Sequence, residues 1–439
     1  MEIAIVGGFG EVGKNMVAVK VENEVVLLDM GIYLPAIINL EDEERINLSE
    51  KRLIEIGAIP NDVFIEEWQP YVKAIVLGHC HLDHIAAIPF SAAKYNAPII
   101  ATPYTLEVLK ATLHDDEIKI VNSFRQLNVN STLKLSDTLK IEFINITHST
   151  PQSTLVAVYT KEGIILYAND FKFDNNPIIG KKPNYKKLKQ LGSRVKVLIL
   201  ESLYADREGK TPSEKVAQEL LNDVLLGVSH KGHIVFVTTF ASHIARLKSI
   251  ISLGRRMKRK IIIFGRSMAK YIGAAEKLGL VKFSKHAKIV AYKKQIKKEL
   301  EKIEKDRGSY LVVCTGSQGE PNSVLDRITK NDVKFGFIPE DSVIFSCRTI
   351  PVEINEANRA ALEMKLKQKK VRIFKDVHVS GHSSREDLRD FINIVKPEHI
   401  IPAHGDLFKM NSLAELATEM GYKLKKNLHV LTDGQKLKL

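Results

Sequence analysis

The sequence predicts an α/β protein, and two patterns lead to that class. From about Val195 onward, short apolar segments alternate with segments whose apolar residues have helical spacing. Such alternation is typical of a doubly wound, mostly parallel sheet. Before that point, residues 1–30 alternate as strands do, with Val17, Val19 and Val21 directed to one side. At 439 residues, the chain is long enough for two or three domains.

Strands are expected where apolar, mostly β-branched residues gather. In chain order they are Val25–Leu28, Ala74–Leu77, Ile164–Tyr167, Val195–Leu200, His233–Val237, Lys260–Phe264, Tyr310–Val313 and Val343–Phe345. Thr211-Pro-Ser-Glu214 predicts a capping box with proline at the first helical position, and apolar residues then follow at helical spacing to Leu225. Residues of roughly 185–365 are therefore expected to form a self-contained α/β domain.

Composition and charge narrow the class of protein. Lysine and arginine number 65 against 52 acidic residues, which gives a net charge of +13. Such an excess favours a polyanionic partner, although the Lys- and Glu-rich surface of a heat-adapted protein explains it equally well. Three cysteines are too few for a disulfide framework, the N-terminus resembles a strand, and no apolar run is long enough to span a membrane. We therefore expect a cytoplasmic protein with no membrane partner.

A glycine-rich segment near the N-terminus resembles a dinucleotide-binding motif. Gly8-Phe-Gly10-Glu-Val-Gly13 follows a strand, and Asp29 stands near the expected acidic position. A true motif of this kind opens a helix, whose N-terminus binds the pyrophosphate. Here Asn15 to Glu24 alternates like a strand, so a glycine-rich hairpin is the better interpretation.

The strongest chemical signal is Gly78-His79-Cys80-His81-Leu82-Asp83-His84, which follows an apolar strand. Imidazole nitrogens combined with a carboxylate suit a borderline ion such as zinc, with manganese as the alternative. We expect His79 and His81 to face one ion. Asp83 and His84 would face a second ion nearby, as in two-metal hydrolytic sites.

Two ions need further ligands, and three more candidates follow strand-like segments. They are His148 in Thr-His-Ser-Thr-Pro, Asp170 in Asn-Asp-Phe-Lys-Phe-Asp, and His404 in Ala-His-Gly-Asp. Each alone would be an ordinary loop residue. Together with the His79–His84 segment they complete the set for two ions, and the carboxylate of Asp170 can bridge both.

These motifs resemble the metallo-β-lactamase superfamily, and the long gap between Asp170 and His404 resembles its β-CASP branch, which inserts a domain there. More closely, the chain resembles the archaeal type of the RNase J family. The stretches that carry this resemblance are Gly7–Asn15, Asp170–Asp174, Gly265–Met268, Cys314–Pro321 and His378–His382. The short segment after His404 resembles the archaeal form, so we expect neither the further C-terminal domain of the bacterial enzymes nor the N-terminal KH modules of the archaeal cleavage-and-polyadenylation relatives.

The resemblance implies a fold and its boundaries. The expected fold is an αββα metallo-β-lactamase sandwich interrupted by a β-CASP α/β domain with a mostly parallel sheet. The expected boundaries are 1–185 and 366–439 for the two parts of the metallo-β-lactamase domain and 186–365 for the insertion.

The resemblance also implies roles for individual residues. Asp29 would orient the site, while Glu201, His382 and His404 match the three β-CASP motifs. An imidazole held by a carboxylate can protonate a leaving alkoxide near neutral pH, so Glu201 and His382 are expected to act as a pair. Asp83 would hold the attacking hydroxide as well as its metal.

A pocket for a 5′-terminal phosphate is the last implied feature. Its candidate residues, which lie in three of the resembling stretches, are Gly316, Ser317, Gln318, Gly319, His378, Ser380 and Arg266. Backbone N–H groups of a glycine-rich loop can cradle a phosphate.

The expected function is two-metal hydrolysis of single-stranded RNA in the 5′→3′ direction, with preference for a 5′-monophosphate. An endoribonuclease, a DNA nuclease of the same fold and a non-catalytic RNA-binding protein are the alternatives. The sequence leaves the oligomeric state open, with a homodimer as one candidate.

Overall fold

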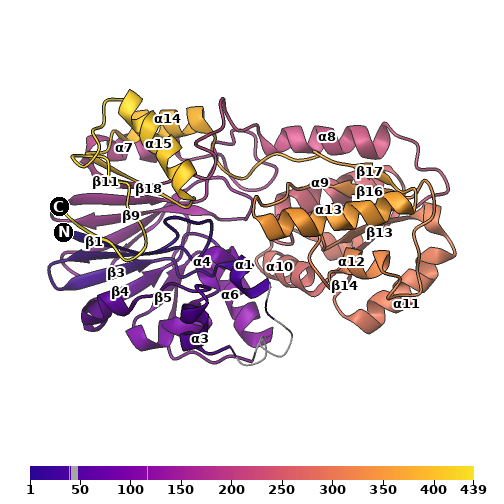
Figure 1. The fold of residues 1–439 in the computed structure, drawn as a ribbon, viewed down its shortest axis with the longest axis horizontal. Coiled ribbons are helices and arrows are strands. Elements are labelled where there is room, and N and C mark those ends of the chain that lie inside the picture. Colours follow the sequence, from indigo (N-terminus) through magenta and orange to yellow (C-terminus); the bar gives the residue numbers. More distant parts are fainter. Residues whose placement is uncertain (39, 41–47, 116) are drawn as a thin grey trace. The chain divides into compact units, whose positions relative to one another are not determined.

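The computed structural model describes residues 1–38, 40, 48–115 and 117–439. The chain divides into two compact units, which interrupt one another along the sequence (Figure 1). Unit 1 consists of Met1–Asn175, Lys181–Thr211 and Gly381–Leu439. Unit 2 consists of Asn176–Gly180 and Pro212–Ser380.

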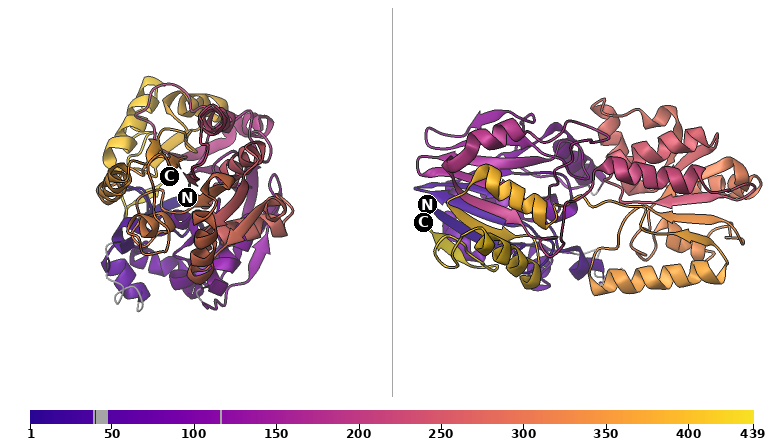
Figure 2. Two further views of the ribbon diagram at one scale, coloured as in Figure 1. Left: turned by 90° about the vertical axis from the view of Figure 1, so that its right-hand side faces the viewer. Right: turned by 90° about the horizontal axis from the view of Figure 1, so that it is seen from above.

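Unit 1 is built on two sheets. The first runs in the order β19 (Lys436–Lys438), β1 (Glu2–Gly7), β2 (Met16–Val21), β3 (Glu24–Leu28), β4 (Val72–Val76), β5 (Ile99–Ala101) and β6 (Phe124–Gln126). The second runs in the order β18 (His399–Ala403), β11 (Val195–Glu201), β10 (Gly163–Ala168), β9 (Thr154–Thr160), β8 (Lys140–Asn145) and β7 (Thr132–Lys134). Strands β1 and β19 pair in antiparallel fashion, so the two termini of the chain lie side by side (Figure 2).

The two sheets form a sandwich with helices outside. One core cluster joins residues of both sheets, among them Val17 and Val76 of the first and Phe143 and Ile199 of the second, all fully buried. A second cluster lies between the second sheet and the helices α7 (Tyr185–Leu191), α14 (Arg385–Val395) and α15 (Leu407–Glu419). Figure 1 shows α3 (Glu50–Glu55) and α6 (Pro103–Asp115) on the side of the first sheet. The expected αββα sandwich is confirmed.

The glycine-rich segment is the connection of a hairpin. Strands β1 and β2 pair in antiparallel fashion, with Ile5 opposite Val17. The segment between them opens no helix. The interpretation as a hairpin, in preference to a dinucleotide-binding motif, is confirmed.

Unit 2 contains one sheet, in which every neighbouring pair is parallel. Its order is β14 (Ala287–Val290), β13 (Lys260–Phe264), β15 (Tyr310–Cys314), β12 (Val235–Thr238), β16 (Ser342–Phe345) and β17 (Arg372–Phe374). Helices lie on both faces of this sheet (Figure 2). They are α8 (Glu214–Leu226), α9 (Ile244–Arg256), α10 (Arg266–Lys277), α11 (Lys293–Glu304), α12 (Val324–Thr329) and α13 (Glu353–Gln368). Of the helices in the described residues, none is long and apolar enough to cross a membrane.

The compact units differ from the expected boundaries at both ends of the insertion. Strand β11, expected at the start of the inserted segment 186–365, pairs with β10 and β18 in the second sheet of unit 1. Strand β17, whose residues fall in the expected segment 366–439, extends the sheet of unit 2 by pairing with β16. Both differences arise because the partner strands decide which sheet a strand joins, and an apolar run does not reveal its partners.

The start of α8 also differs from the expectation. Ser213 caps the helix by accepting a hydrogen bond from the Lys215 N–H, so Thr211 is not the capping residue. The Thr211 N–H, which a capping box would direct to Glu214, donates to the Asp387 carboxylate at 2.7 Å. The carboxylate of Glu214 pairs with the fully buried guanidinium of Arg246 at 2.5 Å. The Thr211 hydroxyl instead donates to the backbone carbonyl of His382.

One glycine provides a test of how tightly the elements around the candidate site pack. A Cβ added to Gly31 would lie 1.6 Å from the carbonyl oxygen of Asp83, so Gly31→Ala must displace the backbone. We expect a loss of stability of about 1–3 kcal/mol, as for other overpacked interiors. Gly273→Ala in α10 is the control, because nothing lies within 4 Å of its added Cβ. Urea unfolding of both variants measures the difference, and equal midpoints would contradict the expectation.

Candidate metal centre and active site

The candidate site lies where several strands of unit 1 end. The loop after β4 carries His79, and His81 caps the short helix α4 (Leu82–Ile85), which holds Asp83 and His84. Asp170 follows β10, and His404 follows β18 directly. Because these strands end on the same side of the sandwich, residues far apart in sequence meet in one place.

Asp170, His404 and the neighbouring Asp29 have a left-handed backbone conformation. The φ angles of Asp29, Asp170 and His404 are 58°, 51° and 53°. Each residue follows a strand, and the left-handed turn redirects the chain as the strand ends. Residues other than glycine adopt this conformation at a cost of about 1–3 kcal/mol each, and such strain clusters at functional sites.

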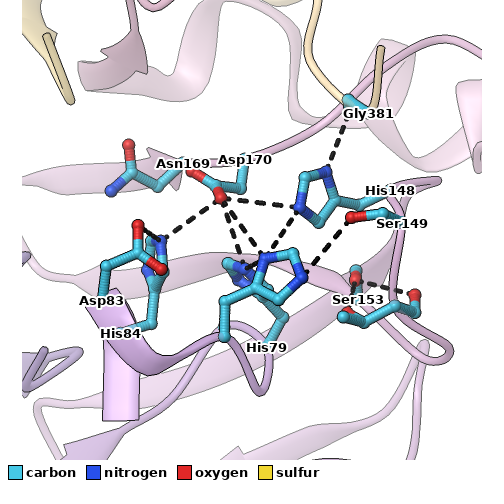
Figure 3. A network of polar contacts seen from close by, with 12 residues as sticks. His79, Asp83, His84, His148, Ser149, Ser153, Asn169, Asp170 and Gly381 are labelled. Atoms are coloured by element: carbon cyan, nitrogen blue, oxygen red, sulfur yellow. Dashed lines mark hydrogen bonds and ion pairs between the residues drawn. The ribbon is translucent and has the colours of Figure 1, made fainter. Parts of the chain in front are cut away.

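The candidate ligands form two groups that share Asp170. The first is His79, His81, His148 and Asp170, and the second is Asp83, His84, Asp170 and His404. Within each group, the potential ligand atoms lie within 4.8 Å of one another. Figure 3 shows the Asp170 carboxylate between His84 on one side and His79 and His148 on the other. Its Oδ2 lies 3.3 Å from Nε2 of both His79 and His84.

The polar atoms of this cluster fit metal ions. Among the described residues, Oδ1 of Asp170 is buried and has no hydrogen-bond partner, although Nε2 of His404 lies 3.2 Å away. Nδ1 of His81 lies 3.0 Å from Nε2 of His79 and 3.2 Å from Nε2 of His148. Converging nitrogens and an unpartnered carboxylate oxygen are what a zinc ion requires of its ligands.

Most of the imidazoles whose pKa is shifted by their surroundings are neutral, which is the state that binds a metal. Burial, with His84 nearby, lowers the pKa of His79 to about 4. Burial also lowers the pKa of His148 and His404, although Asp170 opposes it. Metals bind the neutral imidazole, so these three rings are in the required state at neutral pH. His84 differs, because Asp170 and Asp83 outweigh burial and raise its pKa.

Asp29 orients one side of the cluster. It accepts a hydrogen bond of 2.7 Å from Nδ1 of His84, which leaves Nε2 directed at Asp170. The same carboxylate accepts from the Gly78 N–H at 2.8 Å and from the Tyr167 hydroxyl at 2.9 Å. The geometry agrees with the expected orienting role, since outer hydrogen bonds fix the tautomer of a ligating histidine.

Asn15 has the equivalent place on the other side, and the sequence patterns did not single it out. Its side-chain oxygen accepts from Nδ1 of His404 at 3.0 Å and from the amide of Asn169 at 3.0 Å. Its amide nitrogen donates to the backbone carbonyl of Asp83 at 3.0 Å. Asn15 is 1% exposed and follows the glycine-rich loop directly. The one sequence signal that could have identified Asn15 is its position at the end of the Gly7–Asn15 stretch, which carries part of the family resemblance.

His148 is oriented by Gly381, the first residue of the last segment of unit 1. Its Nδ1 donates to the carbonyl of Gly381 at 2.8 Å, a contact that Figure 3 also shows. Its Nε2 then lies 3.5 Å from Oδ2 of Asp170. In His84, His404 and His148 alike, Nδ1 is used for positioning and Nε2 faces the shared carboxylate.

Glu201 and His382 form a pair beside this cluster. Oε2 of Glu201 accepts from Nδ1 of His382 at 2.6 Å, while its other oxygen accepts from the Phe171 N–H at 2.9 Å. Together with Asp170 the pair forms a third group of closely spaced ligand atoms. Burial alone would lower the pKa of His382, but the charges of Glu201 and Asp170 outweigh it and raise the pKa to about 9.

Solvent reaches the cluster at three residues. The side chains of His81, Asp83 and His382 are 21%, 24% and 18% exposed. Those of His79, His84, Asp170 and His404 are at most 2% exposed. A substrate approaching unit 1 therefore meets the side chains that could hold water or donate a proton, with the remaining ligands behind them.

The residues expected to bind a 5′-phosphate lie in unit 2, after parallel strands. Arg266 follows β13, the Gly316–Gly319 loop follows β15, and His378 and Ser380 follow β17. The carboxyl ends of parallel strands form one edge of a sheet, which is where ligands bind in such folds. His378 and Ser380 are half-buried and Arg266 is exposed.

Several polar groups of the Gly316–Gly319 loop already form hydrogen bonds within the protein. The buried side chain of Gln318 accepts from the Ile350 N–H at 2.7 Å and donates to the Arg348 carbonyl at 3.0 Å. The N–H of Gln318 donates to Glu320 and that of Gly319 donates to Gly316. The Ser317 side chain is buried as well. Gln318 therefore fixes two loops together, and its side chain is not available for a phosphate.

Comparison with known protein families matches three models along the chain. Residues 65–213 match the beta-lactamase superfamily domain, and residues 231–364 match the beta-CASP domain of ribonuclease J. Residues 368–430 match the RNA specificity domain of Zn-dependent metallo-hydrolases. The order agrees with a metallo-β-lactamase domain that is interrupted by a β-CASP domain.

Several known proteins are similar over most of the chain. Ribonuclease J of Methanocaldococcus jannaschii is 44% identical over 99% of this chain and 98% of its own, and that of Pyrococcus abyssi is 44% identical over 99% and 96%. Ribonuclease J of Thermus thermophilus is 32% identical over 98% of this chain and 72% of its own.

A solved structure shares the fold. It is a protein of unknown function from Enterococcus faecalis, with a TM-score of 0.69, 16% identity and coverage of 100% of this chain and 99% of that one. The full-length identity to the archaeal relatives, together with the three family models, places this chain in the ribonuclease J family.

Proposed function

We propose that this protein is a cytoplasmic, metal-dependent ribonuclease that uses two ions, zinc or manganese, to degrade single-stranded RNA in the 5′→3′ direction. The RNA substrate is supported by the family and by the RNA specificity domain that residues 368–430 match. The net charge of +13 agrees with a polyanionic substrate.

The observation that carries the proposal is the central place of Asp170. This carboxylate belongs to both four-residue ligand groups and also to the group that it forms with Glu201 and His382. Two candidate metal sites and a carboxylate–imidazole pair therefore share one carboxylate. This combination suits hydrolysis of a phosphodiester, because charge must be stabilised on the phosphorus and a proton delivered to the leaving oxygen.

The residues around the candidate ions have separate roles in the proposal. When bound, the divalent cations would stabilise the charge of the pentavalent phosphorus and lower the pKa of water. Asp83 accepts a hydrogen bond from the attacking water and orients it. His84 outweighs burial and keeps the pKa of Asp83 far below its usual range, so this carboxylate stays an acceptor at neutral pH.

His382 is the proposed proton donor. Its Nδ1 is held by Glu201, so Nε2 carries the hydrogen that goes to the leaving alkoxide. A pKa of about 9 keeps the ring protonated at neutral pH. Cations bound nearby would lower this pKa toward neutrality, where a general acid works best.

The 5′-phosphate pocket is proposed around His378 and Ser380. Nη1 of Arg246 lies 3.4 Å from Nδ1 of His378, and a guanidinium can only donate, so the hydrogen of a neutral His378 is on Nε2. Burial and the charge of Arg246 hold the pKa of His378 well below its usual range. His378 thus presents one N–H donor. A pocket that accepts one terminal phosphate would disfavour a triphosphate, which adds two further charged groups.

The first prediction from this proposal concerns metal content. Protein purified without chelator should contain close to two equivalents of zinc or manganese. Asn15→Ala should weaken metal binding by about 10–100-fold, because His404 loses the group that orients it. Competition with a chromophoric chelator measures both values.

Asn393→Ala, on the exposed surface of α14, is the control and should bind metal as the parent does. A metal content that stays at zero after reconstitution would contradict the two-ion proposal.

The second prediction concerns the general acid. His382→Ala should slow hydrolysis by about 10²–10⁴-fold, with metal content retained, because only a proton donor is removed. A general acid works in its protonated form, so activity of the parent should fall as pH rises through the pKa of His382, at or below about 9. This alkaline decline should be absent from the variant's kcat profile.

The exposed His286 provides the matched control, and His286→Ala should keep both the rate and the profile. If His382→Ala cleaved RNA at the parent rate, the assignment of the acid would be wrong.

The third prediction concerns the substrate end. RNA with a 5′-monophosphate should be degraded faster than the same RNA with a 5′-triphosphate, with mononucleotides released from that end. Ser380→Ala should reduce this preference more than the basal rate, whereas Ser193→Ala, on the surface of unit 1, should change neither. Strands labelled at the 5′ or 3′ end measure the order of release.

Other products would identify the alternatives. Early labelled mononucleotide from a 3′-labelled strand, or cleavage of a circular RNA, would replace the 5′→3′ assignment with an endonuclease. Equal cleavage of single-stranded DNA would widen the substrate class, and binding without cleavage would indicate a non-catalytic RNA-binding protein.

A further inference from the structure

The connection after β11 carries an arginine that no role described above uses. The guanidinium carbon of Arg207 lies 3.5 Å from the centroid of the Tyr204 ring. The backbone of this connection is fixed, because the Arg207 N–H donates to the Tyr204 carbonyl at 3.1 Å and the Arg385 N–H donates to the Arg207 carbonyl at 2.9 Å. A fixed backbone and a stacked side chain give the guanidinium a defined position.

Tyr204 places this charge close to the proposed acid. Its ring, 8% exposed as a residue, meets the His382 ring edge-on with 5.8 Å between centroids and an interplanar angle of 86°. Tyr204 also forms a β-bridge with Ser384, two residues beyond His382. Arg207 is therefore separated from His382 by a single aromatic ring, and all these residues belong to unit 1.

The guanidinium lacks the partner that neighbouring arginines have. Arg385 pairs with Glu419 at 2.6 Å, and Arg389 pairs with Glu419 at 2.8 Å. Within the residues that the structure describes, no carboxylate forms an ion pair with Arg207, which is half-buried. Stacking on a ring uses the face of a guanidinium and leaves its five N–H donors, which lie in the plane, for another group.

We infer that Arg207 binds a phosphate of the RNA strand next to the scissile phosphodiester, with Tyr204 holding the guanidinium in place. This inference rests on the proposed ribonuclease function. Arginine suits the role because its planar donors match two phosphate oxygens at once. The ring beneath it restricts the side chain before RNA arrives, which reduces the entropy lost on binding.

Salt dependence of RNA binding tests the inference. The background is Asp83→Asn, in which bound 5′-phosphorylated RNA should not be hydrolysed. Each phosphate contact with a single strand contributes about 0.7 to the slope of log affinity against log salt. Arg207→Met should lower the slope by about that amount and weaken binding by roughly 10-fold to 100-fold. Arg207→Lys should keep the slope but bind more weakly, because lysine is a point charge.

Arg389→Met is the matched control, since that guanidinium is neutralised by Glu386 and Glu419, and its slope should equal that of the background. A lower melting temperature of Arg207→Met with an unchanged slope would mean that Arg207 only supports Tyr204, and the inference would be wrong. If the protein without the Asp83 change neither binds nor cleaves RNA, the proposed function fails, and the inference fails with it. If that protein cleaves RNA and Arg207→Met has the background slope, the inference alone fails.

Discussion

The site depends on one buried carboxylate. Asp170 is 2% exposed, and burying a negative charge costs several kcal/mol unless donors or cations surround it. Burial alone would raise its pKa, but His404 and His84 hold the pKa of Asp170 well below its usual range. The second sheet supplies His404, because the parallel pairing of β10, β11 and β18 brings the ends of β10 and β18 together, while His84 comes from α4 after β4 of the first sheet. A change in the register of the second sheet would separate the Asp170 carboxylate from His404.

Backbone strain and outer hydrogen bonds act together around this carboxylate. Asp29, Asp170 and His404 each hold a left-handed conformation that costs about 1–3 kcal/mol. Strain of this kind persists only where surrounding structure fixes it. Asp29 is fixed by three hydrogen bonds, and His404 is fixed by Asn15 and by its own N–H bond to the Gly8 carbonyl. The glycine-rich hairpin, which resembles a nucleotide motif in sequence, thus supports the candidate ligands.

The sequence predicted the αββα sandwich, the inserted parallel sheet and a compact set of candidate ligands. The run from His79 to His84 was visible because its polar residues lie within one loop. The role of Asn15 was not visible in the sequence, because its partners are distant along the chain and an isolated asparagine carries no periodic signal. Distant partners also explain why β11 was assigned to the wrong sheet, because the strands that it pairs with, β10 and β18, lie before and after it in the chain. Gln318 shows the opposite failure: a motif indicated ligand binding, but the side chain holds a neighbouring loop.

The charge excess illustrates why position matters more than composition. A net charge of +13 was equally consistent with a polyanion-binding protein and with a heat-adapted surface. Many basic residues are paired on the surface, as Lys134 is with Asp137 and Lys161 with Glu22, and such exposed pairs attract a polyanion only weakly because their charges cancel. Arg207 differs because its charge is unpaired among the described residues and stacked on Tyr204, one ring away from His382. On the proposed function, we therefore expect steering of RNA to depend on a few uncompensated charges held beside the candidate site, which a total count of charges cannot reveal.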